Sequence, residues 1–196
     1  MTRALATLAT RARLRPARAR YFVTLLAIAA LLTACGGSSQ SGNAFVFLTV
    51  DRFSLNGTTA TASVTSSTNP GTTTSACVTL RNNLKNPTLT APNALDNVTI
   101  QSYTVTLSGG GSPGPFTFGT SVLVPTGTVT AGVLSGNTAT FGVVLVPTGA
   151  KSSSGTVATA EVTFQGRDGR GLSVETEGAI TVVFVAGATD SVCAAP

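Results

Sequence analysis

Apolar side chains alternate with polar ones along most of the chain beyond residue 44. In ATAEVTFQ, residues 158–165, one face carries alanine, valine and phenylalanine, while the other carries threonine, glutamate and glutamine. TATFGVVLV, residues 138–146, has the same period of two, and AITVVFV, residues 179–185, is apolar almost throughout. A period of two is typical of strands with one buried face, and a short apolar run is typical of a central strand. The pattern therefore predicts an all-β domain.

A tight turn separates two of the alternating segments. GRDGRG, residues 166–171, has three glycines and an Asp-Gly pair, which supply the positive backbone angles that a close reversal needs. We therefore predict a β-hairpin. Its charged residues, Arg167, Asp168 and Arg170, are interpreted as a solvent-exposed loop tip or, alternatively, as a contact site for a partner.

Two features predict where strands end or bend. VLVPTG occurs at residues 122–127 and again at 144–149, and we expect each copy to be a strand that ends at its proline, since proline cannot donate to the sheet. In NVTIQSYTVTL the apolar period slips between Ile100 and Tyr103. Either a β-bulge lies near Gln101, or the strand passes from one sheet to another.

The strands and turns together favour a sandwich. We count about eight or nine short strands and no convincing helix after residue 44, which predicts an antiparallel β-sandwich over residues 44–196. The strand number and hairpins such as FQGRDGRGLSVETEGAITVVF make the chain similar to the immunoglobulin-like modules of bacterial surface lipoproteins. Tryptophan is absent, so the Cys-Trp-Cys core of antibody domains is missing. This resemblance implies a fold and does not fix a function.

The first 34 residues have the layout of a signal peptide. Residues 1–20 contain six arginines and no acid, and residues 21–34, YFVTLLAIAALLTA, contain no charge. A basic segment, a short apolar helix and a small residue before a break are typical of a secretory leader. The apolar run has 14 residues, fewer than the roughly 20 that a membrane-spanning helix needs.

Leu32-Thr33-Ala34-Cys35 resembles the lipobox of bacterial lipoproteins at every position. The resemblance implies cleavage between Ala34 and Cys35 and attachment of a lipid to the Cys35 thiol. Two or three acyl chains would then hold the protein stably at a membrane. Residues 35–43 are interpreted as the lipidated cysteine and a tether. In Gram-negative lipoproteins an aspartate after the cysteine favours the inner membrane, and Gly36 instead favours the outer membrane.

Removal of the leader changes the charge of the chain. The full sequence has a net charge of +5, but six of its twelve basic residues lie in the leader. The remaining 162 residues carry six basic and seven acidic side chains, a net charge of −1. No basic stripe is left to contact phosphates, which argues against nucleic-acid binding.

Two cysteines, Cys77 and Cys193, remain after lipidation of Cys35. In an oxidising compartment they are a candidate disulfide, with two unpaired thiols as the alternative. The alternation of SACVTL places Cys77 on the face opposite Ala76, Val78 and Leu80. We therefore expect Cys77 to point away from the core, toward a C-terminal tail.

Catalytic and metal-binding patterns are weak. The chain has no histidine, which removes the usual general base and the commonest zinc ligand. Residues 110–114 match the G-x-S-x-G pattern, but no helix follows and no histidine can complete a triad. The acids are too scattered for a calcium loop. We expect no catalytic residue, no metal and no cofactor.

The favoured hypothesis is a lipid-anchored, non-enzymatic binding or structural module of the cell envelope. Its partners would be the membrane, through Cys35, and an envelope protein or a glycan. The alternative is a carbohydrate-binding accessory domain of a surface assembly, which the absence of tryptophan weakens. An enzyme that uses only carboxylates is the third hypothesis. The long loop over residues 81–97 is the expected recognition surface.

Overall fold

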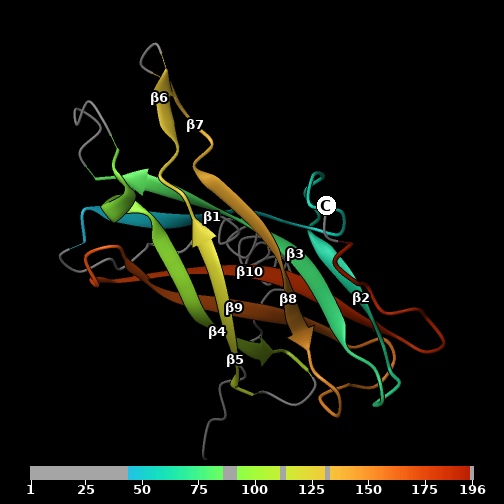
Figure 1. Ribbon diagram of the computed structural model, residues 1–196. Helices are drawn as coiled ribbons and strands as arrows, with labels where there is room; N and C mark the ends of the chain where they lie inside the picture. The colour runs from blue at the N-terminus through green and yellow to red at the C-terminus, as the bar shows by residue number, and fades with distance from the viewer. Residues whose placement is uncertain (1–43, 86–91, 111–113, 131–132, 195–196) are drawn as a thin grey trace, which may run out of the picture. The chain divides into compact units, whose positions relative to one another are not determined.

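Strands make up most of the described chain (Figure 1). The computed structural model describes residues 44–85, 92–110, 114–130 and 133–194, which all belong to one compact unit, Gly36–Pro196. The expected signal helix, the cleavage site at Ala34 and Cys35, and the tether lie outside the described residues. Within the described ranges, no helix has the length and apolar character needed to cross a membrane.

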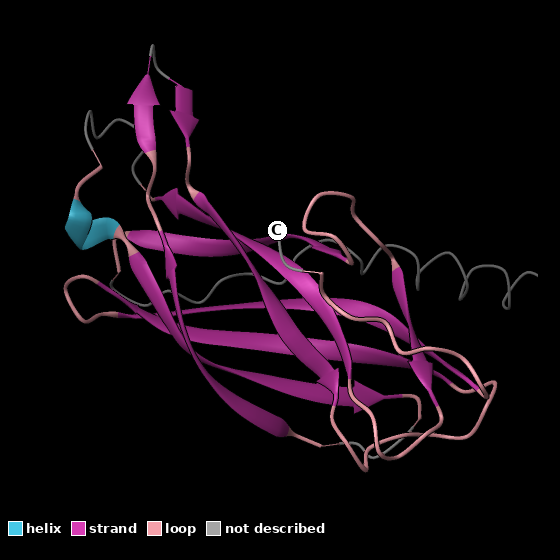
Figure 2. Cartoon of the chain, turned by 45° about the vertical axis from the view of Figure 1, so that its right-hand side comes forward, coloured by secondary structure: helices cyan, strands magenta, loops and turns pink. Residues whose placement is uncertain are grey.

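Two sheets face each other (Figures 1 and 2). One has the order β1-β3-β8, formed by β1 (Val46–Ser54), β3 (Thr74–Leu84) and β8 (Thr138–Val146). The other has the order β2-β10-β9-β4-β5, formed by β2 (Ser63–Ser67), β10 (Ser173–Val185), β9 (Val157–Asp168), β4 (Val98–Ser108) and β5 (Phe116–Val124). A hairpin of β6 (Thr128–Thr130) and β7 (Val133–Ser135) projects from one end, and a short 3-10 helix, η1 (Ala94–Asp96), precedes β4.

The strand order is that of an immunoglobulin-like sandwich. Such folds place the first, second and fifth strands (A, B and E) with D in one sheet, and C, F and G in the other. Here β1, β3 and β8 correspond to A, B and E, while β4, β9 and β10 correspond to C, F and G, with β5 added beside β4. Among the described residues, no strand fills the D position beside β8.

The predicted all-β sandwich is confirmed, and the structure adds two details to it. The described residues form ten strands rather than about eight or nine, because the connection between β5 and β8 contains the small β6–β7 hairpin. The sandwich is also not wholly antiparallel, since β2 pairs with β10 in parallel. After β1 the chain crosses to the facing sheet, and β2 then runs along β10 in the same direction.

The period-two pattern determines the core, as predicted. In β9, Ala160, Val162 and Phe164 are fully buried, while Glu161 and Gln165 are exposed. β10 lies between β2 and β9, which confirms the central position expected for its apolar run. β5 and β8 end at the residue before Pro125 and before Pro147, as the two VLVPTG copies predicted.

The slip in β4 is a bulge within one sheet. The register shifts between Ile100 and Ser102 against both β5 and β9, so the first alternative is confirmed. The extra residue lets Ile100 and Tyr103 both face the core. It also brings the backbone close to Gly166, where an added Cβ would lie 2.5 Å from the Thr99 carbonyl oxygen. Only glycine fits at this position of β9.

Candidate functional site

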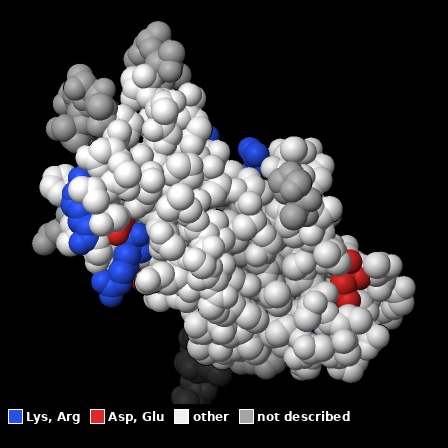
Figure 3. All heavy atoms as spheres, viewed as in Figure 1, with Lys and Arg blue, Asp and Glu red and all other residues white. Residues whose placement is uncertain are grey.

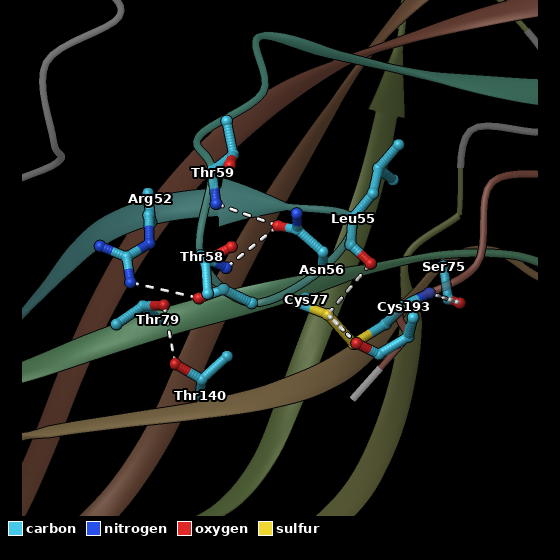
Figure 4. Close-up of a disulfide and its surroundings, with 12 residues drawn as sticks. Arg52, Leu55, Asn56, Thr58, Thr59, Ser75, Cys77, Thr79, Thr140 and Cys193 are labelled. Carbon is cyan, nitrogen blue, oxygen red and sulfur yellow. Dashed lines mark hydrogen bonds between the residues drawn. A yellow bond between two sulfur atoms is a disulfide. The ribbon is translucent and has the colours of Figure 1, made fainter. Parts of the chain in front are cut away.

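The candidate site residues Ala34 and Cys35 lie outside the described part of the chain. The other two, Cys77 and Cys193, are joined by a disulfide with an S–S distance of 2.02 Å (Figure 4). Cys77 lies on the outer face of β3, as its alternation predicted, but the C-terminal tail and the residues after β1 cover it completely. Cys193 packs against Gly142 of β8, with Sγ 3.6 Å from where a Cβ would be.

The C-terminal tail beyond β10 joins the two sheets along one side of the sandwich. The Ser191 amide donates to the Thr65 carbonyl of β2 over 2.8 Å, and the Ser75 amide of β3 donates to the Ser191 carbonyl over 2.9 Å. The Ala194 amide donates to the Leu55 carbonyl over 2.9 Å. We call β1, β2 and this tail the closed side.

A buried ion pair lies at the start of the tail. Lys151 Nζ is 2.6 Å from Asp190 Oδ1, and the exposed fractions of the two side chains are 2% and 8%. The ammonium also donates to the hydroxyls of Ser66 and Thr74, at 3.1 and 2.8 Å. The same carboxylate oxygen accepts from the Ser67 amide at 2.8 Å. The pair therefore connects β2, β3 and the tail.

These contacts change the acidity of Asp190. Burial alone would raise its pKa, but hydrogen bonds from Lys151, Thr72, Thr74 and the Ser67 amide outweigh burial and lower the pKa from 3.8 to about 2. The carboxylate is therefore ionised at every physiological pH. Its environment holds a fixed charge and is not suited to proton transfer near neutrality.

The structure describes residues 81–85 and 92–97 of the expected recognition loop, and parts of both stretches form regular structure. Residues 81–84 still belong to β3, so the loop is shorter than predicted. Its second half forms η1, which packs against the β9–β10 turn: the Gly169 amide donates to the Leu95 carbonyl over 3.0 Å. A Cβ at Gly169 would lie 2.7 Å from Leu95 Cα, so this contact requires glycine.

The charges of the β9–β10 turn form a local network rather than a fully solvated tip. Arg170 is 2.6 Å from Asp96 and lies over the Phe45 ring, with 4.8 Å from Cζ to the ring centroid. Asp168 is buried and accepts from the amides of Arg170 and Leu172. Figure 3 shows that charged atoms are sparse on the face viewed, with the larger group of Lys and Arg atoms at this end of the sandwich.

Three of the acidic residues lie on one exposed face of a sheet. Glu161, Glu175 and Glu177 are exposed on the outer face of the five-stranded sheet. Within the described residues, no group of three potential ligands lies close enough together to hold a metal ion. These carboxylates fit the reading of a solvated face.

The opposite side of the sandwich is formed by the edge strands β5 and β8, and we call it the open side. Neither strand contains a charged residue. Phe116, Phe118 and Val122 of β5 pack against the core yet remain half-buried. Tyr103 bridges the two sheets here: its ring stacks on Phe118 with 5.1 Å between centroids, and its hydroxyl accepts from the Val144 amide of β8 over 3.0 Å.

Two of these features were not foreseen from the sequence. Lys151 and Asp190 are 39 residues apart, and nothing in their local pattern marks them as partners. The Tyr103 contact needs two sheets to meet, although the isolated tyrosine on an apolar face was a signal that its hydroxyl would need a partner.

Comparison with known proteins adds no assignment. No protein-family model, no curated protein and no solved structure matches this chain.

Proposed function

We propose that this chain is a lipid-anchored, non-enzymatic binding or structural module of a bacterial cell envelope, attached to the membrane by lipid on Cys35. The observation that carries the proposal is the sequence LTAC at residues 32–35, placed directly after a basic and then apolar leader. Outer-membrane attachment is favoured in a Gram-negative host, because Gly36 follows the cysteine.

The disulfide supports an extracytoplasmic location. Disulfides persist in the periplasm and at cell surfaces, whereas the cytosol keeps thiols reduced. With Cys77 bonded to Cys193, Cys35 is left as the odd cysteine of three. An unpaired cysteine in an exported protein is expected to be bonded elsewhere or reactive, and acylation of Cys35 would account for it.

A carbohydrate-binding role is less favoured. Sugars are usually held by exposed aromatic rings. Among the described residues Tyr103 is buried, and Phe45 is the one exposed phenylalanine. Its ring already lies beneath Arg170, so no broad stacking platform is present in this part of the chain.

The test is the variant Cys35→Ser, expressed with a clickable palmitate analogue. We expect no acyl label, no cleavage at residue 35 and loss of the mature protein from the membrane fraction. Ser39→Ala is the matched control, since it changes a residue outside the motif and should keep the label. If Cys35→Ser were still labelled and cleaved, the anchoring proposal would be wrong.

A second variant tests the membrane. Gly36→Asp introduces the residue that favours inner-membrane retention, so the protein should move from the outer- to the inner-membrane fraction of a density gradient. Gly36→Ala should not move. Acylated wild-type protein found in the inner-membrane fraction would contradict the outer-membrane assignment alone.

A further inference from the structure

The three-stranded sheet of this sandwich has a vacant edge within the described residues. β8 pairs with β3 on one side only, at the position where immunoglobulin folds add strand D. β5, the last strand of the facing sheet, lies opposite this edge. We call the empty strand position next to the free edge of β8, facing β5 of the other sheet, the slot.

The backbone of β8 directs hydrogen-bonding groups into the slot. Successive residues of a strand send their amide and carbonyl groups to alternate sides. The Val144 amide points to the open side, since it donates to Tyr103 Oη over 3.0 Å. The regular pairing from Ala76↔Val143 to Arg81↔Thr138 means that Thr140 and Gly142 face the same way. The backbone groups of Thr140 and Gly142 therefore face the slot and are not used in pairing with β3.

The side chains of the slot are apolar and only partly covered. Phe116, Phe118 and Val122 form one wall, from β5, while Ala139 and Phe141 form the other, from β8; all five pack on the core but are not buried. No charged residue lies in either strand. Long, uncharged edge strands invite pairing with another chain.

The chain's own ends do not supply this strand. Ala44 leads into β1, the far edge of the same sheet. The C-terminal tail is bonded to β2 and β3 on the closed side, and its Cys193 contacts β8 only at the position where a Gly142 side chain would be. Residues 36–43, GGSSQSGN, also lack the alternating apolar side chains that the walls would bind.

We propose that the slot binds an extended, uncharged peptide segment of another envelope protein, which adds to β8 as an antiparallel or parallel strand. Apolar side chains at alternate positions of the segment cover Phe118, Val122 and Phe141, and small polar side chains face solvent. Main-chain hydrogen bonds to Thr140 and Gly142 hold the segment, as in other strand-addition complexes. This inference deepens the binding role proposed above by naming its surface and its partner class.

The test uses the lipid-free body, Gly36–Pro196, which forms a compact unit, and random peptides displayed on phage. We expect the selected peptides to alternate apolar with small polar residues. The most enriched peptide, synthesised, should slow amide exchange at Thr140 and Gly142. Because the body carries no lipid, failure here leaves Cys35 anchoring untouched, and failure of anchoring leaves this result intact.

Matched variants locate the contact. Thr140→Pro removes a slot-facing amide but keeps the backbone bonds to β3, and should weaken binding of the selected peptide about tenfold. Thr140→Val loses the hydroxyl contact to Thr79 but keeps the amide, and should bind normally. Val122→Lys, which places a charge in the wall of the slot, should abolish binding. Ser63→Lys, on the exposed start of β2, is its control.

Several results would overturn the proposal. One is a selection that enriches no alternating sequence. Another is full binding to both Thr140→Pro and Val122→Lys, provided that each variant keeps the wild-type circular dichroism. Amide protection confined to β1 or β2 would also overturn it, as would dimerisation of the body that excludes the peptide.

Discussion

The edge strands on the two long sides of the sandwich differ in charge, length and coverage. On the closed side, β1 carries Asp51 and Arg52 and bulges at that point. β2 has only five residues, and the tail covers it. On the open side, β5 and β8 each have nine residues with no charge. Charges, bulges and short length are the usual ways to stop an edge strand from pairing with other chains.

The comparison shows where this sequence uses its few charges. Arg81 forms a two-pronged contact with Asp51 on the closed side, and the buried Lys151–Asp190 pair lies there too. The open side relies instead on aromatic packing and one tyrosine hydroxyl. The closed side is therefore fixed by covalent and ionic contacts, while the backbone groups along the free edge of β8 stay accessible on the open side.

Removal of the disulfide should have the largest effect. The bond joins residues 116 apart, and loop-closure entropy for such a loop is about 4 to 5 kcal/mol. We expect the double variant Cys77→Ala/Cys193→Ala to lose stability of that order in urea unfolding. Amide exchange should rise first at Thr65 and Ser75, on the closed side. An equal rise in amide exchange at Thr140, on the open side, would show that the two sides are not independent.

Breaking the buried ion pair should have the second-largest effect on stability. Lys151→Met leaves the Asp190 carboxylate buried without its cation, which typically costs about 3 to 5 kcal/mol. Adding Asp190→Asn removes the charge and keeps an acceptor for the Ser67 amide, so the double variant should recover much of the loss. Urea unfolding of the two single variants and the double variant measures this. A double variant as unstable as Lys151→Met would mean that charge is not the cause.

Acid should weaken the closed side over a defined range. The folded pKa of Asp190 is about 2, below its ordinary value of 3.8. The stabilisation is therefore complete above pH 4 and is lost as the pH falls from about 4 to about 2. The expected loss is about 2 kcal/mol. Asp190→Asn should lack this slope in unfolding curves collected across that range, and an identical slope in the variant would assign the acid sensitivity elsewhere.

Local pattern was enough to predict much of this fold. Alternation in β9 and the apolar run of β10 depend only on neighbours in sequence, and both were read correctly. A slip in the same period indicated either a bulge near Gln101 or a strand that changes sheets, and the structure has the bulge. Parallel pairing of β2 with β10 could not be predicted, because it depends on how the chain crosses between sheets.

The candidate surfaces were harder to predict than the fold. The slot exists because β8 has a partner on one side only, and no local pattern shows the absence of a neighbour. The repeated VLVPTG drew attention to β5 and β8 as strands that end at proline, but not to their shared side. The predicted lipobox is different, since its positions are contiguous and it remains a prediction from sequence alone.

The smallest effect should come from the one polar contact of the open side. Tyr103→Phe removes the acceptor of the Val144 amide and should cost about 1 kcal/mol at neutral pH. Burial raises the pKa of Tyr103 above its ordinary 10.0, so the folded protein keeps a neutral phenol where the unfolded chain ionises. Wild-type stability should therefore fall as the pH rises beyond 10, and the variant should show less of this fall.

Tyr103 is the only tyrosine after residue 34, because the other is Tyr21. Tyrosinate absorbance of the body therefore reports this one hydroxyl directly. A normal titration midpoint near 10 would place the hydroxyl in solvent and contradict the bridge to β8. A raised midpoint together with faster exchange at Val144 in Tyr103→Phe would show that this hydroxyl is what protects that end of the β8 edge. It would also leave Thr140 and Gly142 as the part of the edge open to a partner.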